Sequence, residues 1–168
     1  MARAYFVAGL AGSGKSYYSR KIAKELDLKI VDFDDNFNEF INAHKDEYEQ
    51  LGSEKFLANY ASTRYADLIN RAVIELEKNV SVVIAAPFSK QLQDQILWDE
   101  LTSPIKKFDS NPTLYWVVIS DELRKKRLIT RGEIRDAEKI KKIDEYIKFS
   151  PAKTPVVEHV LVQGDTRV

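Results

Sequence analysis

Residues 9–16 constrain this chain more than any other stretch. They read Gly-Leu-Ala-Gly-Ser-Gly-Lys-Ser and fit the pattern G-x-x-x-x-G-K-[ST] of the phosphate-binding P-loop without a mismatch. A short apolar run of strand type, residues 4–8, precedes the motif, and apolar residues at helical spacing follow it. The P-loop requires this order of strand, glycine loop and helix, so the start of the chain predicts a binding site for ATP or GTP.

Each residue type in the motif has a physical role in holding phosphate. Glycines let the backbone approach a polyphosphate closely, and the loop amides together with the positive end of the next helix form a cradle for an anion. Lys15 adds a charge for the β- and γ-phosphates, and the Ser16 hydroxyl is predicted to ligate Mg²⁺. The predicted ATP-binding residues of this stretch are Gly9, Ala11, Gly12, Ser13, Gly14, Lys15, Ser16 and Tyr17. A chance match in a glycine-rich turn is the alternative, and the flanking strand and helix disfavour it.

Composition limits the class of protein and its partners. The 168 residues suit one domain, which we expect to span residues 1–168. The 26 basic residues balance 26 acidic ones, so no bulk field indicates a nucleic-acid or membrane partner, although a local basic groove stays open. The chain has no cysteine, no apolar run of membrane-spanning length, and no room for a signal peptide before its first strand. We therefore expect a cytoplasmic protein.

Five runs of strand type alternate with helical patterns along the chain. They cover residues 4–8, 29–33, 80–86, 113–119 and 156–162. This alternation predicts a three-layer α/β sandwich with a five-stranded, mostly parallel sheet. We expect helices at 36–50 and over the long stripe that follows Gly52, and we expect Ser89 and Ser120 to cap further helices. Ligands of such sheets bind at the carboxyl ends of the strands.

An acidic cluster follows the second predicted strand. Alternation along the strand points Asp32 and Asp34 to the same side, toward the crevice beside the P-loop. Phosphoryl transfer to a hydroxyl needs a group that orients the acceptor and carboxylates that help to hold Mg²⁺. We expect Asp34 to act as the acceptor-orienting base and Asp32 to support the metal and border the acceptor. The alternative is that these acids only solvate a loop or cap the next helix.

Arginines recur in a later predicted helix. Arg124, Arg127 and Arg131 share one face at spacings of three and four, and Arg135 lies across a break at Gly132. A solvated basic face is the alternative, but planar guanidinium groups stabilise charge on a transferring phosphoryl group. We expect a short lid over about residues 127–138, in which Arg131 and Arg135 are catalytic and Arg127 contacts ATP. Arg124 is assigned to the surface.

Two further residues are candidates for binding the phosphoryl acceptor. Arg64, near the start of the long helix, could bind an anionic acceptor or form a surface salt bridge. Phe88 follows the third strand, at the predicted ligand-binding edge, and could line the acceptor pocket.

In combination, the P-loop, the short second strand leading into Asp34, and the arginine pattern resemble the small P-loop kinases. The nearest groups are the kinase domain of phage-type polynucleotide 5′-kinases and the related zeta-toxin and "predicted kinase" proteins; shikimate and gluconate kinases are more distant. The resemblance implies a nucleoside-monophosphate-kinase-like fold, with ATP and Mg²⁺ as cofactors. It also implies that Asp34 activates the acceptor hydroxyl and that Arg131 and Arg135 are lid arginines.

One departure from those kinases bears on the metal. The third strand ends Ala85-Ala86-Pro87 without an acid, which shifts metal support to Asp32 or Asp34. The leading hypothesis is an ATP-dependent kinase that phosphorylates a hydroxyl of a nucleotide, a nucleic-acid end or a small molecule. The alternatives are a nucleotide-binding switch or ATPase that acts through a partner, a toxin-like nucleotide-sugar kinase, and a non-catalytic binding protein.

Overall fold

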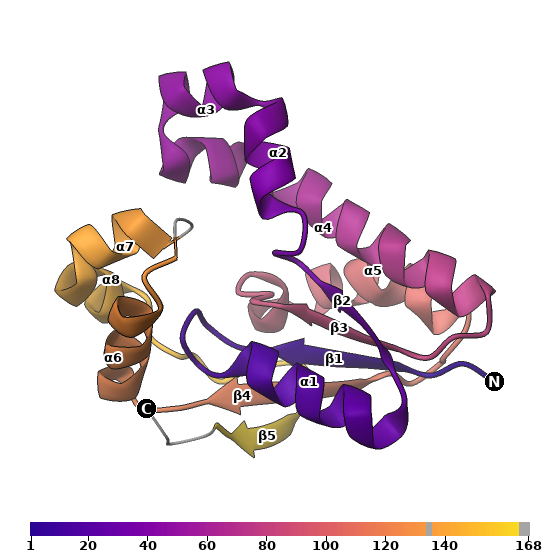
Figure 1. Cartoon of the computed structure of the whole chain (residues 1–168). Coiled ribbons are helices and arrows are strands. Elements are labelled where there is room, and N and C mark those ends of the chain that lie inside the picture. Colours follow the sequence, from indigo (N-terminus) through magenta and orange to yellow (C-terminus); the bar gives the residue numbers. More distant parts are fainter. Residues whose placement is uncertain (134–135, 165–168) are drawn as a thin grey trace.

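A computed structural model describes residues 1–133 and 136–164. Its five strands form one sheet in the order β2-β3-β1-β4-β5, and each of the four neighbouring pairs is parallel. The strands are β1 (Ala4–Ala8), β2 (Lys29–Asp32), β3 (Val82–Ala86), β4 (Thr113–Val118) and β5 (Val160–Gln163). The predicted α/β class and five-stranded sheet are confirmed, and all carboxyl ends lie at one edge (Figure 1).

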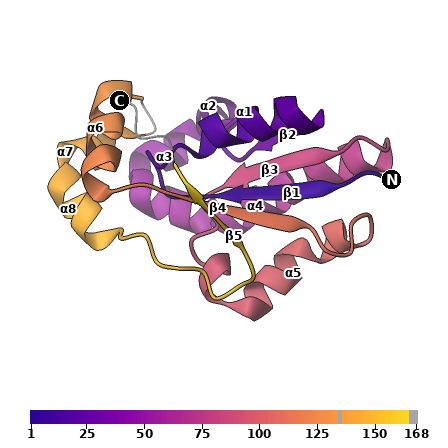
Figure 2. The ribbon, with the colours of Figure 1, turned by 90° about the horizontal axis from the view of Figure 1, so that it is seen from below.

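Helices cover both faces of the sheet and extend beyond its carboxyl edge. They are α1 (Lys15–Leu26), α2 (Phe37–Ala43), α3 (Lys45–Leu51), α4 (Ser53–Glu77), the 3-10 turn η1 (Gln91–Gln93), α5 (Gln95–Lys106), α6 (Asp121–Arg131), α7 (Ala137–Lys141) and α8 (Ile143–Phe149). Figure 2 shows α1 and α5 on opposite sides of the sheet.

Side chains of β1 point alternately to the two faces of the sheet, which explains why helices pack on both faces and give three layers. Phe6 and its alternate neighbours join a core with α4 and α5, whereas Val7 packs with Ile22 of α1. Successive strand residues point to opposite faces, so a fully apolar central strand can serve two helical layers at once. β3 is buried along its whole length for the same reason.

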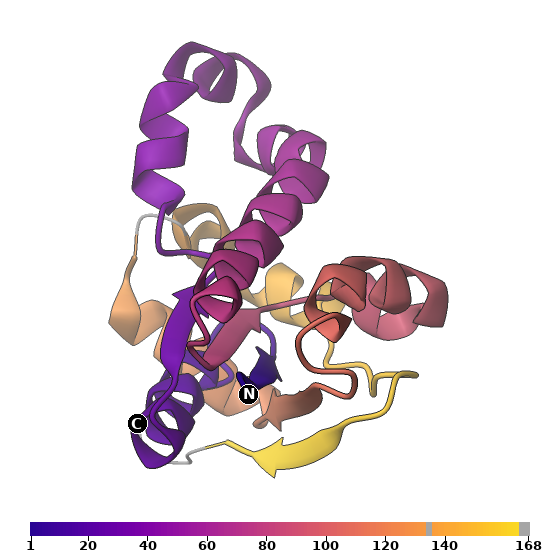
Figure 3. The ribbon, with the colours of Figure 1, turned by 90° about the vertical axis from the view of Figure 1, so that its right-hand side faces the viewer.

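Two helical groups extend the domain beyond the carboxyl edge. Figures 1 and 3 show α2 and α3 as an arm that leads into α4, and Figure 1 shows α6, α7 and α8 gathered beside the P-loop end of the sheet. Where the arm meets the start of α4, the rings of Phe40, His44, Phe56 and Tyr60 contact one another at 4.7–5.9 Å between centroids. A small aromatic cluster therefore joins the arm to α4.

Several predicted boundaries differ from the structure. The helix expected over residues 36–50 is divided at His44 into α2 and α3. Ser120 caps α6 as predicted, but Asp94 rather than Ser89 caps α5, with its carboxylate accepting from the amides of Ile96 and Leu97. The last strand begins at Val160, four residues later than expected, because the amide of Val156 is bonded to the carbonyl of Leu92 instead of to the sheet.

In the part of the chain that the structure describes, no helix combines the length and the apolar character needed to cross a membrane.

Candidate active site

The P-loop connects β1 to α1 and leaves the start of that helix available to an anion. Gly14 has φ of +96°, a conformation that favours glycine, and α1 begins at the next residue, Lys15. No described side chain caps α1, and its first turn contains no acid. The positive end of this 12-residue helix can therefore bind a negatively charged group.

The interior of the loop also fits a polyphosphate. Ser13 Oγ is buried and has no hydrogen-bond partner among the described residues. A side chain at Gly9 would place its Cβ 2.4 Å from that oxygen, so the loop can close this tightly only with glycine there. A buried hydroxyl without a partner is costly in a finished protein and indicates a position for a ligand oxygen or water.

The acidic turn after β2 adjoins the P-loop. The Asp34 amide donates to Asp32 Oδ1 at 2.9 Å, which fixes the turn. Burial and the neighbouring charges of Asp34 and Asp35 raise the pKa of Asp32, while the Asp34 amide and the positive charge of Lys15 oppose that shift. The charge of Lys15 therefore acts on Asp32, and the two predicted features form one electrostatic site.

The protein oxygens at this site could hold Mg²⁺ only together with the phosphates of a bound nucleotide. Within the described ranges, no three His, Cys, Asp or Glu side chains are grouped so that they could hold a metal ion. Mg²⁺ is usually held by one or two protein oxygens, waters and substrate phosphates rather than by a complete protein cage. Ser16 and Asp32 supply that number of oxygens, so the residues present fit a nucleotide-bound Mg²⁺.

Arg64 of α4 contacts the acidic turn and helps to hold it in position. Its Nη2 atom donates to the Phe33 carbonyl at 3.1 Å and lies 3.8 Å from Asp34 Oδ1. Its guanidinium carbon lies 4.0 Å from the centre of the Phe33 ring, with Phe37 and Phe40 also nearby. Only 8% of the side chain is exposed, and burial lowers the pKa of Arg64 although the Asp34 charge opposes this. The structure thus places Arg64 against Asp34 rather than at a surface open to an acceptor.

Phe88 is not placed to line an acceptor pocket. Its ring is fully buried against Phe6, Tyr65 and Trp98, at φ of +51°. That prediction is wrong because the chain turns inward after β3 and the Phe88 amide donates to the Tyr65 hydroxyl at 3.0 Å. The residues on either side of it, Pro87 and Ser89, do line a cavity of about 220 Å³ beside the first residues of the P-loop.

The predicted lid arginines have different surroundings. Arg127 reaches the P-loop, since a Cβ at Gly14 would lie 3.0 Å from its Nη1 atom. Arg131 instead pairs with the buried carboxylate of Asp136, to which its Nε donates at 3.0 Å, and Lys139 binds the other oxygen of that carboxylate at 3.1 Å. Burial opposes ionisation of Asp136, but the Arg131 hydrogen bond and the two positive charges outweigh it and lower its pKa. Arg135 lies outside the described residues.

The sequence predicts Arg124 at the surface, and that prediction is wrong. Its side chain is 1% exposed and connects three segments. Nη1 donates to Asp121 Oδ1 at 2.9 Å and to the Ser150 carbonyl at 3.0 Å, and Nε donates to the Ala11 carbonyl at 3.4 Å. Helical spacing places Arg124 on the same face as Arg127 and Arg131, but it does not show which segments cover that face. The one sequence signal for a paired Arg124 was Asp121, an acid three residues earlier on the same helix.

Gly164 is a supporting residue that the sequence analysis missed. Its amide donates to the Val118 carbonyl at 2.8 Å, and a Cβ there would lie 2.3 Å from Ile119 Cγ2 and 2.7 Å from the Ser13 carbonyl. The chain leaving β5 therefore packs directly beneath the P-loop. A glycine at the end of the last strand was the signal in the sequence.

This combination of P-loop, parallel sheet and edge acids has relatives. The sequence profile of the AAA_33 family, described as an AAA domain, matches residues 5–148. The chain belongs to this family. No curated protein sequence matches this AAA_33 domain.

Two solved structures share the fold of the AAA_33 domain at low sequence identity. A proposed kinase from Chloroflexus aurantiacus has a TM-score of 0.67 at 15% identity, over 98% of this chain and 85% of its own. A sugar kinase from Janibacter has a TM-score of 0.60 at 14% identity, over 97% of this chain and 86% of its own. The domain therefore has the α/β fold of P-loop kinases.

Proposed function

We propose that this AAA_33 protein is an ATP-dependent kinase that transfers the γ-phosphoryl group to a hydroxyl. The observation that carries the proposal is that the P-loop after β1 and the acidic turn after β2 lie at the same carboxyl edge of the sheet. There the positive charge of Lys15 acts on Asp32. A phosphate-binding loop beside a carboxylate pair is what hydroxyl phosphorylation requires.

The residues of the P-loop side bind and orient the nucleotide. Lys15 and the amides at the start of α1 hold the phosphates, and Arg127 adds a second positive charge beside Gly14. Ser16 and Asp32 are the residues that would hold Mg²⁺. When bound with ATP, that ion would supply further neutralisation of the charge that develops on the phosphates.

The residues of the acidic turn handle the acceptor. Asp34 accepts the hydroxyl proton as the acceptor attacks the γ-phosphorus, and the bond from that phosphorus to the β,γ-bridging oxygen breaks. Arg64, which lies 3.8 Å from Asp34 and is bonded to the preceding carbonyl, holds this carboxylate in position.

The lid arginines complete the site in this proposal. Arg131 exchanges its contact with Asp136 for the transferring phosphoryl group, and Arg135 contributes from the same segment. Arginines supplied in this way are worth on the order of 10³–10⁵ in turnover in related chemistry. The Asp136 carboxylate would then keep Lys139 as its partner.

The acceptor hydroxyl belongs to a nucleotide, a nucleic-acid end or a small molecule. The resemblance to polynucleotide 5′-kinases and zeta toxins favours a nucleotide-containing acceptor, whereas one structural neighbour is a sugar kinase. A switch or partner-dependent ATPase is less favoured because β3 ends in Ala85 and Ala86 without the carboxylate that such proteins use beside the metal.

The test is transfer of ³²P from γ-labelled ATP with Mg²⁺ to a panel of acceptors. The panel holds 5′-hydroxyl DNA and RNA oligonucleotides, nucleosides, nucleotides, nucleotide sugars and small hydroxylated metabolites. We expect label on one class, its loss in Asp34→Asn, and its retention in the control Asp27→Asn, which makes the same change at an exposed acid that follows α1. Release of free phosphate alone, unchanged in Asp34→Asn, would instead identify an ATPase and overturn the proposal.

A further inference from the structure

Two consecutive carbonyl groups of the acidic turn each accept a hydrogen bond from an arginine of α4. Arg64 donates to the Phe33 carbonyl, and the Nη2 atom of Arg71 donates to the Asp32 carbonyl at 3.1 Å. Positions 64 and 71 are about two helical turns apart, so both arginines lie on one face of α4. That face meets the turn that carries the two proposed functional carboxylates, Asp32 and Asp34.

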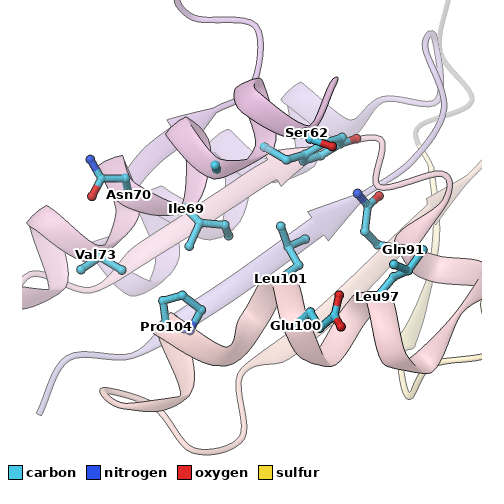
Figure 4. Close-up of a pocket in the computed structure, with 11 residues that line it drawn as sticks. Ser62, Ile69, Asn70, Val73, Gln91, Leu97, Glu100, Leu101 and Pro104 are labelled. Carbon is cyan, nitrogen blue, oxygen red and sulfur yellow. The ribbon is translucent and has the colours of Figure 1, made fainter. Parts of the chain in front are cut away.

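The rest of α4 is held by the core. Figure 4 shows Ile69 on the side of the helix that faces α5, and Val73 lines the same groove between the two helices. Leu68 and Ala72 are fully buried. Because close packing fixes α4 in this way, contacts from its arginine face can fix the turn in turn.

Asp67 holds the Arg71 side chain in place. Its Oδ2 atom accepts from Arg71 Nε at 2.9 Å and from Asn36 Nδ2 at 3.3 Å. The planar guanidinium thus binds Asp67 through Nε and the Asp32 carbonyl through Nη2. The ion pair is partly exposed, with 28% of Arg71 and 46% of Asp67 accessible, so it adds little to stability and its effect is mainly on geometry.

The bond from Arg71 acts on the peptide group between Asp32 and Phe33. The N–H of this peptide donates to the Ala85 carbonyl of β3 at 2.9 Å, and its C=O is the acceptor for Arg71. The sheet therefore fixes one side of the peptide and α4 fixes the other. This peptide sets the path of the turn, in which the Asp34 amide binds the Asp32 carboxylate.

We propose that Arg71 is a positioning residue for Asp32, which keeps the Asp32 carboxylate where it can support the Mg²⁺ of a bound nucleotide. This inference rests on the proposed function, in which Asp32 is a metal-supporting residue. Arg64 has the matching task for Asp34, so the two arginines of α4 divide the acidic turn between the metal and the acceptor.

The test measures how much Mg²⁺ strengthens nucleotide binding, a quantity that does not depend on turnover. A non-hydrolysable ATP analogue would be titrated calorimetrically into each protein, once with saturating Mg²⁺ and once with EDTA. We expect Arg71→Gln to reduce the gain in affinity from Mg²⁺ about tenfold, with little change in EDTA, since partners that hold a metal-supporting group contribute on this scale. Arg20→Gln, the same change at an exposed position of α1, should keep the full gain.

The sign of the effect separates positioning from charge. Loss of a positive charge close to Asp32 would by itself strengthen Mg²⁺ binding, whereas loss of the bond to the Asp32 carbonyl weakens it. Arg71→Lys keeps the charge but lacks the planar fork that reaches Asp67 and the carbonyl together, so it should behave as Arg71→Gln does. In an Asp32→Asn background, Arg71→Gln should have no further effect on the gain, because both changes act through one carboxylate.

An unchanged or larger gain from Mg²⁺ in Arg71→Gln would overturn the proposal. An equal loss in the Asp32→Asn background would also overturn it, because the effect would then be a general structural one. Failure of the kinase proposal is a separate result: if no acceptor is labelled but the variants show the expected Mg²⁺ dependence, the kinase assignment falls and the role of Arg71 is supported.

Discussion

Arg64 and Asp34 form an ion pair, 3.8 Å between Nη2 and Oδ1, that joins the middle of α4 to the turn after β2. The arginine side of this pair is buried, because Arg64 packs on the Phe33 ring and its Nη2 atom also donates to the carbonyl of that residue. A proposed catalytic carboxylate is thus held by the helix that carries the arm of α2 and α3.

Arg64→Gln should lower both turnover and stability. Loss of the guanidinium leaves Asp34 without its buried partner, and misplacement of a catalytic group by about 1 Å can reduce rates on the order of 100-fold. Loss of stacking on Phe33 should reduce the free energy of unfolding by about 1–2 kcal/mol. Steady-state kinetics and urea denaturation measure the two effects, with Arg20→Gln on the exposed face of α1 as the control. Full turnover in a destabilised Arg64→Gln protein would limit this arginine to packing.

Lys15→Ala and Arg131→Ala should differ in what they remove. In the proposed mechanism Lys15 contacts the phosphates before and during transfer, so its loss should weaken both ATP binding and turnover. Arg131→Ala should lower kcat by about 10³-fold with little change in ATP affinity, since its contact forms only during transfer. Calorimetric titration with a non-hydrolysable ATP analogue, combined with single-turnover kinetics, distinguishes the two; Lys126→Ala, exposed on α6, is the control. Wild-type activity in both variants would contradict the assignment.

Asp32→Asn should stabilise the protein at neutral pH while it impairs activity. Burial raises the pKa of Asp32 above 3.8, so the folded protein holds the proton more tightly than the unfolded chain does. The free energy of unfolding therefore falls as the pH rises from about 3.8 through the raised pKa of Asp32 in the folded protein. At pH 7 the ionised Asp32 destabilises the folded state. The asparagine keeps the oxygen that accepts from the Asp34 amide. Melting temperatures should favour Asp32→Asn at pH 7 and converge toward pH 4; an equal difference at both pH values would refute this account.

Gly164→Ala should disturb the P-loop from below. The added Cβ would lie 2.7 Å from the Ser13 carbonyl and 2.3 Å from Ile119 Cγ2, and such overpacking costs about 1–3 kcal/mol. Gly132→Ala is a useful comparison, because there the cost arises from a positive φ of +56° with the nearest atom 3.8 Å away. Both variants should melt earlier, but only Gly164→Ala should also weaken nucleotide binding. Unchanged nucleotide affinity in Gly164→Ala would show that the loop does not depend on this support.

The sequence allowed the fold to be predicted because its strongest signals are local. The P-loop pattern, the apolar β3 run and the serine before α6 each depend on neighbouring residues, and each is confirmed in the structure. The division at His44 was not predicted, because the rings that pack around it come from α2 and α4, which are separate in the sequence.

The candidate site was less predictable because its members meet through tertiary packing. Arg124 has the spacing of a surface arginine, and only the approach of Ala11 and Ser150 buries it. Phe88 follows a strand at the ligand-binding edge, yet its backbone turns the ring into the core. The roles of Asp34, Arg127 and Arg131 stay predictions.

The burial of Arg124 has a consequence for local unfolding. A single guanidinium is bonded to the P-loop at Ala11, to the first turn of α6 at Asp121 and to the segment after α8 at Ser150. If one of these segments opened alone, the Arg124 guanidinium would lose a hydrogen-bond partner while it stayed buried. The three segments are therefore expected to open together. Amide hydrogens that depend on these three contacts should therefore exchange with one common free energy of opening, as a cooperative unit that joins the phosphate-binding loop to the helices beside it.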